Sequence, residues 1–217
     1  LGEVVYADLL PPQRARLHRS IASALAQQPT DALRRADRAG ELAFHLDLAG
    51  DIEEAFTALL AAADVAETIA PAAAFSHLER AFELWDAAGA SAGAANRGHR
   101  LWQAADIATS TVGNERAVQL ARAAFEHGPP PLGAAWGHER LGRYLWATGR
   151  QQESSAEFAK AVALLNEDDG TAAAAVYAGL GQAECADFAA VAQAGQVLAA
   201  LHLVGVTEDV VDAQVVV

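Results

Sequence analysis

The chain has no methionine and only one cysteine, Cys185. One cysteine cannot form an internal disulfide, so the fold must be held together by packing. Because no methionine stands even at position 1, we interpret the chain as a segment of a longer protein. No basic segment followed by an apolar one opens it, so the sequence predicts no secretory signal and a cytoplasmic location.

Aromatic residues and positive charge are also scarce. Aromatics make up 6% of the chain although hydrophobic residues make up 53%, so much of the apolar content is alanine, which favours helix. The formal net charge is -13. Because affinity for nucleic acid comes largely from Lys and Arg that displace counterions, we expect no direct binding to nucleic acid.

One stretch, residues 188–207, has no charged side chain over the length that a membrane-spanning helix requires. It is rich in alanine and contains Gln193, Gln196 and His202 in place of the Leu, Ile and Phe that favour insertion. We therefore expect a buried helix there and no membrane span.

Apolar residues recur at helical spacing through most of the chain. Leu17, Ile21 and Leu25 follow Pro11 and Pro12, which suit a helix start. The pattern predicts further helices over 41–69, 72–88, 100–127 and 134–165, with a loose segment at 89–98, a break at 128–131, a turn at 166–170 and weaker helices beyond it. The 41–69 segment is broken at Gly50, with Asp51 as N-cap and Glu54 as its capping-box partner.

The best repeat begins near Ala135. Within it Leu141 and Gly142 occupy the seventh and eighth positions, and Gly149, Phe158 and Ala161 stand at later fixed positions. This spacing resembles the tetratricopeptide motif of about 34 residues, in which small residues let paired helices approach and large ones fill the gap. Ser154 replaces the usual small alanine. A second copy places its equivalents at Leu42, Ala43, Leu46, Gly50, Ala55, Leu59 and Ala62.

The predicted fold is therefore all-α, with tetratricopeptide-like helical hairpin repeats that form a right-handed solenoid. The intervals between copies are irregular, so we expect hairpins of uneven length. A helical bundle is the alternative that periodicity alone leaves open.

The first 90 residues also resemble the central region of large ATP-binding LuxR-type transcriptional regulators. The resemblance is carried by a Y-x-x-L…R…L-H pattern, whose members are Tyr6, Leu9, Arg14, Leu17 and His18. It implies that residues 1–30 are the C-terminal remnant of a winged-helix segment associated with an ATPase, and that residues 31–217 are the repeats. Related signalling ATPases begin with a nucleotide cyclase domain instead. The chain itself has no G-x4-G-K-[ST] loop to hold phosphates.

No catalytic, cofactor or metal site is predicted, and we expect the chain not to be an enzyme. The histidines do not pair with one another or with Cys185 at helical spacing, which zinc sites require. His18 and His138 are interpreted as structural. The acidic run Glu167–Asp169 is interpreted as a solvated turn, and Cys185 as a buried, inert thiol because no base lies near it in sequence.

A predicted binding groove is the one candidate site. Trp136, Glu139, Arg143 and Trp146 are spaced to share one helix face, and Trp102 would lie on a similar face one repeat earlier. Trp and Arg are the residue types that anchor interfaces. The alternative is that these tryptophans fill the core between irregular helices.

The function predicted from these patterns is a ligand- or protein-binding sensor or scaffold in a multidomain ATP-dependent transcriptional regulator. Its partners would be a protein, peptide or small-molecule effector in the groove and the ATPase module of the parent chain. One alternative is a stand-alone protein-interaction adaptor, and another is the repeat region of a nucleotide-cyclase-linked signalling ATPase. A third, an all-α enzyme or small-molecule carrier, is disfavoured because no acid, base or metal set converges.

Overall fold

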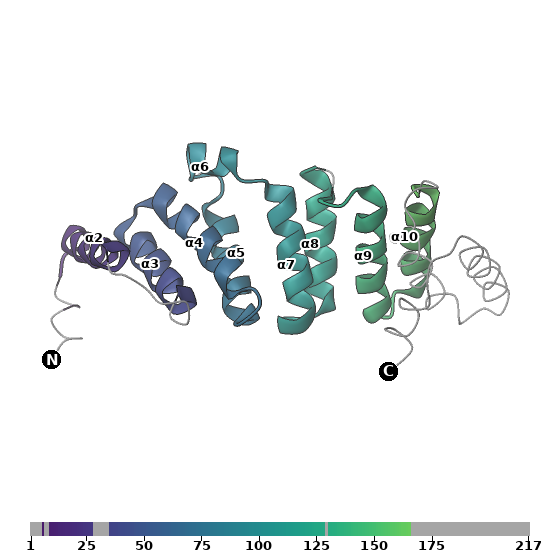
Figure 1. Cartoon of the computed structure of the whole chain (residues 1–217), viewed down its shortest axis with the longest axis horizontal. Helices are drawn as coiled ribbons and strands as arrows, with labels where there is room; N and C mark the ends of the chain where they lie inside the picture. Colours follow the sequence, from purple (N-terminus) through teal and green to yellow (C-terminus); the bar gives the residue numbers. More distant parts are fainter. Residues whose placement is uncertain (1–5, 7–8, 28–34, 129, 166–217) are drawn as a thin grey trace. The chain divides into compact units, whose positions relative to one another are not determined.

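The computed structural model of the chain describes residues 6, 9–27, 35–128 and 130–165. Within these residues every regular element is a helix (Figure 1). In chain order the helices are α2 (Pro11–Gln27), α3 (Arg35–Ala49), α4 (Ile52–Ala66), α5 (Pro71–Leu84), α6 (Gly89–Ala94), α7 (Arg97–Thr111), α8 (Asn114–Glu126), α9 (Ala134–Ala147) and α10 (Gln151–Ala163). The all-α prediction is confirmed.

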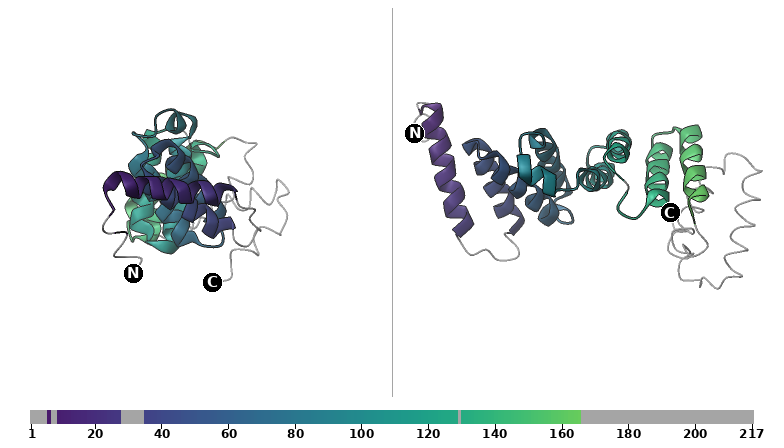
Figure 2. Two further views of the ribbon diagram at one scale, coloured as in Figure 1. Left: turned by 90° about the vertical axis from the view of Figure 1, so that its left-hand side faces the viewer. Right: turned by 90° about the horizontal axis from the view of Figure 1, so that it is seen from above.

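The helices fall into two compact units, Leu1–Val112 and Gly113–Val217. In the first unit α2 packs on α3, α3 on α4, α4 on α5, and α5 on α7; in the second, α8 packs on α9 and α9 on α10. Because only two or three residues join α3 to α4 and α9 to α10, the helices of each pair are antiparallel, as the views in Figure 2 also show. These are the helical hairpins that the repeat pattern predicts.

The α9–α10 hairpin confirms the predicted small-against-large packing. A Cβ atom placed on Gly142 would lie 3.1 Å from the ring of Phe158, so the absence of a side chain lets the ring reach the backbone of α9. Ser154 donates a hydrogen bond from Oγ to the carbonyl of Gly142 at 2.8 Å. Leu141, Ser154, Phe158 and Ala161 are all buried. The motif residues are therefore the contact between the two helices.

The turns of the α3–α4 and α9–α10 hairpins have the same geometry. Gly50 and Gly149 each have φ of 76°, a left-handed conformation that favours glycine. Helices α3 and α9 each end in a Schellman motif, in which two backbone N–H groups after the helix donate to two of its last carbonyls. The bonds run from Gly149 N to Trp146 O, Arg150 N to Leu145 O, Gly50 N to Asp47 O and Asp51 N to Leu46 O.

The start of α4 departs from the prediction. Asp51 is the N-cap residue, but its side chain makes no capping hydrogen bond, so the predicted capping box with Glu54 is wrong. The carboxylate accepts instead from Arg19 on α2, with Nε at 2.7 Å from Oδ2, and it also pairs with Arg19 Nη2. A bidentate, charge-assisted pair is stronger than a bond to a neutral N–H, which explains why the side chain turns toward α2.

The segment 89–98 was expected to be loose, and this expectation is wrong for Gly89–Ala94, which form the short helix α6. Ala88 and Ala92 are buried at 0% and 9% exposure, and α6 packs on α4. Burial of small side chains against α4 therefore stabilises a segment whose glycines give it low intrinsic helix propensity.

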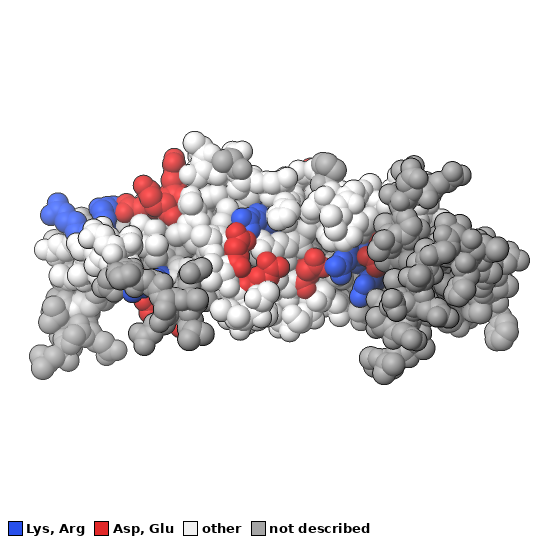
Figure 3. Space-filling model, viewed as in Figure 1, with Lys and Arg blue, Asp and Glu red and all other residues white. Residues whose placement is uncertain are grey.

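Ion pairs between helices far apart in the sequence cross the first unit. Arg80 on α5 donates to both carboxylate oxygens of Asp47 on α3, at 2.7 and 2.8 Å. Arg100 on α7 pairs with Asp64 on α4. Figure 3 shows acidic and basic side chains in contact at several places on an otherwise mostly uncharged face. These pairs fix which residues of neighbouring helices lie opposite each other.

Several predictions fall on residues outside the described part of the chain. They are the turn at 166–170 with its acidic run Glu167–Asp169, the helices beyond it, Cys185 and the uncharged stretch 188–207. The boundary at residue 30 between a winged-helix remnant and the repeats stays a prediction. In the structure α2, which lies before that boundary, packs on α3 within the same unit.

Replacement of Gly142 by alanine tests the helix contact. The added Cβ would meet the Phe158 ring at 3.1 Å, and overpacking of this kind costs about 1–3 kcal/mol, which outweighs the gain of about 1 kcal/mol in helix propensity. We expect a lower urea midpoint with an unchanged slope. Gly93→Ala is the control, because nothing lies within 4 Å of its added Cβ; a more stable Gly142→Ala variant would contradict the packing described.

Candidate functional site

The predicted site residues of the second unit lie together on α9. The helix is continuous from Ala134 to Ala147, so Trp136, Glu139, Arg143 and Trp146 share one face of it. Trp136 and Trp146 are half-buried, Arg143 is exposed, and Glu139 is shielded from solvent at 5% exposure. We refer to these four residues as the α9 face.

Trp102 is not part of the α9 face. It lies on α7 in the first unit and is 1% exposed. A side chain this deeply buried offers no surface to a partner, so the alternative interpretation of the tryptophans as core residues holds for Trp102.

The two charged residues of the α9 face, Glu139 and Arg143, form an ion pair within the helix. Arg143 Nη1 lies 3.5 Å from Glu139 Oε1, one turn earlier. Next to it the guanidinium of Arg140 lies over the ring of Trp136, 5.5 Å from its centroid, a cation–π contact that orients the indole. The face therefore presents partly exposed aromatic rings around positive charge, a composition found at binding interfaces.

His138 has the structural role that the sequence predicts. Its ring stacks on Phe125 of α8 with centroids 4.8 Å apart, and its Nδ1 donates to Glu157 Oε2 on α10 at 2.6 Å. Burial acts to raise the pKa of Glu157, but hydrogen bonds from Lys160 and His138 outweigh it and hold that pKa below its usual range. His138 thus connects α9 to both neighbouring helices.

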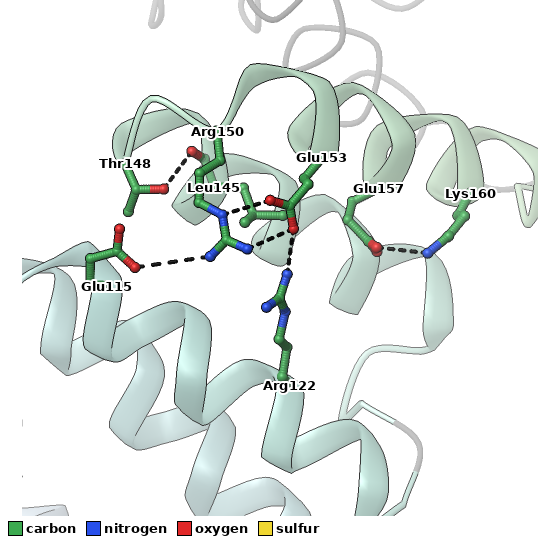
Figure 4. Close-up of polar contacts among 8 residues, drawn as sticks. All are labelled: Glu115, Arg122, Leu145, Thr148, Arg150, Glu153, Glu157 and Lys160. Atoms are coloured by element: carbon green, nitrogen blue, oxygen red, sulfur yellow. Dashed lines mark hydrogen bonds and ion pairs between the residues drawn. The ribbon is translucent and has the colours of Figure 1, made fainter.

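An ion-pair network fixes the other end of the same hairpin (Figure 4). Glu153 accepts from Arg150 at 2.8 and 2.7 Å and from Arg122 of α8 at 2.7 Å, and Arg150 lies 4.0 Å from Glu115. These exposed pairs are individually weak. Together with His138 they attach α8 to α10 at two levels and so hold α9 in place.

Sequence reasoning missed a polar cluster between α2 and α3. Tyr6 donates from its hydroxyl to His18 Nε2 at 2.9 Å, and His18 Nδ1 lies 2.8 Å from His45 Nδ1. With Tyr6 as donor, His18 carries its proton on Nδ1 and donates it to His45 Nδ1. The structural interpretation of His18 is confirmed, whereas its partner His45, 27 residues away, has no local sequence signal.

The environment of His18 disfavours a charged ring. The side chain is 6% exposed, and burial, followed by the repulsion from His45, lowers its pKa from the usual value. Burial alone lowers the pKa of His77 on α5. Both rings are therefore expected to be neutral at pH 7.

Among the described residues no group of three or more His, Cys, Asp or Glu could hold a metal ion. None of the helices in this part of the chain is both long enough and apolar enough to span a membrane.

Comparison with known proteins gives limited similarity. No family model and no curated protein matches the chain. Among solved structures it is similar to BtubC (BKLC) from P. vanneervenii, with 16% identity and a TM-score of 0.43 over 90% of this chain and 93% of the other. It is also similar to a Podosopora anserina protein described as a kinesin light chain with nearly identical TPR-like repeats, with 17% identity and a TM-score of 0.31 over 87% and 84%. The helical-repeat fold stated above rests on the hairpins of this chain.

The lowered pKa of His18 predicts how stability changes with pH. Because the unfolded ring binds a proton near pH 6.5 and the folded ring only at lower pH, the unfolded state takes up more protons in that window. The free energy of unfolding should therefore fall as pH drops from 7.5 through 6.5. Urea unfolding at pH 7.5 and 5.5 measures this, and His18→Gln should reduce the difference between the two. The control His99→Gln, at an exposed position, should leave the difference unchanged; an undiminished difference in His18→Gln would contradict the assignment.

Proposed function

We propose that this chain is a protein- or peptide-binding scaffold that uses the α9 face, and that it serves as the sensor portion of a multidomain ATP-dependent transcriptional regulator. The observation that carries the proposal is the α9 face itself, where two half-buried tryptophans flank the exposed Arg143. Large aromatic and Arg side chains contribute most of the binding energy in interfaces.

The way α9 is held favours binding over core packing as the role of these residues. The hairpin contact uses Leu141, Gly142 and Tyr144, which are buried, so Trp136 and Trp146 are not needed to fill it. Because His138 and the Glu153 network fix α9 against α8 and α10, a partner would meet side chains already in position and would lose less conformational entropy.

The proposal places the chemistry of the parent protein outside this chain. The one buried histidine among the described residues, His18, is occupied by hydrogen bonds with Tyr6 and His45. We therefore propose a non-enzymatic role, in which the α9 face binds the attached ATPase module and effector binding shifts that module between two states. A cytoplasmic location is part of the same proposal.

The parent role rests on the resemblance of the N-terminal residues, and their contacts support it. Tyr6 bonds to His18, Arg14 donates from Nε to Leu9 O at 2.9 Å, and the Arg14 guanidinium lies over the Tyr6 ring. The residues that carry the resemblance thus form one local structure, which is a reason for them to occur together.

Substitution of both tryptophans tests the α9 face. Because Trp136 and Trp146 are half-buried, we expect Trp136→Ala/Trp146→Ala to lower stability by less than the roughly 3–5 kcal/mol typical of a buried aromatic and to abolish binding of the purified ATPase module of the parent protein. Thermal unfolding and a pull-down measure the two effects. Phe158→Ala, which removes a ring that is 1% exposed, is the control for loss of packing. A double variant as unstable as Phe158→Ala would assign the tryptophans to the core.

A pull-down of the chain against the parent's ATPase module, with and without ATP, tests the parent role. We expect association to depend on nucleotide, because a sensor that shifts an equilibrium must bind the two states with different affinity. Association that is equal with and without ATP, or absent in both, would contradict this role and favour a stand-alone adaptor.

A further inference from the structure

We infer that one face of the α2–α3 pair is a docking surface for an amphipathic helix of another protein. Nine large hydrophobic side chains are exposed in the described part of the chain, and five of them belong to these two helices or the residues just before them. The five are Tyr6 (37% exposed), Leu10 (64%), Leu17 (41%), Phe44 (58%) and Leu48 (44%). Single exposed apolar residues are ordinary, but a cluster indicates an interaction site. We refer to this cluster as the α2–α3 face.

The two helices that carry the face are antiparallel, as Figure 2 also shows. Near the end of α2, Leu25 O accepts from Arg38 near the start of α3 at 3.0 Å. One turn and a half earlier on α2, Arg19 donates to Ala49 O at the end of α3. His18, next to Arg19 on α2, meets His45 on α3, and this contact marks the line along which the helices touch.

Helical geometry puts the exposed residues of both helices on the same side of that line. Leu17 immediately precedes His18, and Phe44 immediately precedes His45, so each is turned from the interface in the same sense. In an antiparallel pair, residues turned in the same sense lie on one face. The rings of His18 and Phe44 confirm the placement, since they meet edge to face with centroids 6.4 Å apart. Leu10 is seven residues before Leu17, and Leu48 is four after Phe44, which continues each stripe.

Charge differs between the two ends of the face. On α3, Asp37 and Glu41 precede Phe44 and Leu48 at three- and four-residue spacing, so all four residues lie on one face of the helix. Both acidic side chains are exposed. At the opposite end, Arg14 lies over the Tyr6 ring, and α2 (Pro11–Gln27) contains no acidic residue. The face is therefore apolar in the middle, acidic beside the end of α2 and basic beside its start.

These features specify the occupant. A helix with apolar residues at i, i+3 or i+4, and i+7 would bury its stripe against Leu17, Phe44 and Leu48. Acidic residues are favoured in the first turn of a helix and basic ones in the last, so a helix that runs in the direction of α2 would set its acidic start near Arg14 and its basic end over Asp37 and Glu41. Among the described helices only α10 has an acidic residue in its first turn and a basic one in its last, Glu153 and Lys160. Both are already paired beside their own hairpin, Glu153 with Arg150 and Arg122 and Lys160 with Glu157, so the occupant is a helix of another protein.

The test uses a synthetic helix as the probe. It is a capped, fluorescein-labelled peptide of about 16 residues, long enough to lie along α3 at 1.5 Å per residue, with Leu at i, i+3 and i+7, two Glu in the first turn and three Lys in the last. A second peptide exchanges the Glu and Lys ends. We expect the first peptide to bind the full chain at least about tenfold more tightly than the second in fluorescence anisotropy, with a difference that shrinks as salt is added.

Variants of exposed residues locate the site. Phe44→Ser/Leu48→Ser should weaken binding of the first peptide at least about tenfold, with circular dichroism unchanged because both side chains are exposed. The melting temperature should fall only slightly, through the loss of the Phe44 ring contacts with His18 and His45. Asp37→Lys/Glu41→Lys should weaken the first peptide and strengthen the second. Ile69→Ser/Val112→Ser is the matched control, since these residues are exposed elsewhere in the same unit, and it should change nothing.

Three outcomes would overturn the inference. The first is no binding of either peptide at about 1 mM, a concentration that detects affinities near the weakest specific complexes. The second is equal binding of both peptides or equal loss in the control variant. The third is a dimer in sedimentation velocity that Phe44→Ser/Leu48→Ser dissociates, which would make a second copy of this chain the occupant. None of these uses the α9 face, so they are separate from tests of the proposed function.

Discussion

Close approach of paired helices is the constraint on which the rest of this structure depends. In the α9–α10 hairpin Gly142 makes this approach possible, because its missing side chain leaves room for the Phe158 ring. A Cβ atom on Gly142 would lie only 3.1 Å from that ring. The hydroxyl of Ser154 then reaches the Gly142 carbonyl. Since the helices meet backbone to ring, a fixed spacing of small and large residues along the chain sets both the distance and the rotation of the two helices.

The small-against-large contact acts within one hairpin and does not determine which other helix packs beside it. Polar contacts between partly exposed side chains do so. The Asp51 side chain does not cap the N-terminus of its own helix but pairs with Arg19. Asp47 and Asp64 pair with arginines from helices further along the chain. Each pair is partly exposed and contributes little stability alone. Their effect is on register, because a guanidinium that finds a carboxylate in only one alignment disfavours the alternatives. An acidic chain with few basic residues uses several of its arginines in this way.

The sequence was sufficient for the local parts of this fold and insufficient for the contacts between them. Helix positions, the turn glycines Gly50 and Gly149 and the Gly142–Phe158 contact were predictable because each depends on residues within one hairpin. The His18–His45 bond, the loss of the Asp51 capping box and the burial of Trp102 were not, because they depend on helices about 30 or more residues away or on what covers a helix face. The sequence assigns Trp102 and Trp136 to similar helix faces, yet Trp102 is buried and Trp136 is half-buried.

Function in such a fold is left to positions that the hairpin contact does not use. Every buried motif residue is committed to holding two helices together, and substitution there changes stability before it changes binding. The α9 face and the α2–α3 face lie outside this requirement and differ in character. The first combines indole rings with Arg143, whereas the second is aliphatic and phenyl with acidic residues at one end. Because they belong to different compact units, the two proposed surfaces can be substituted independently of each other and without any change to the core of either hairpin.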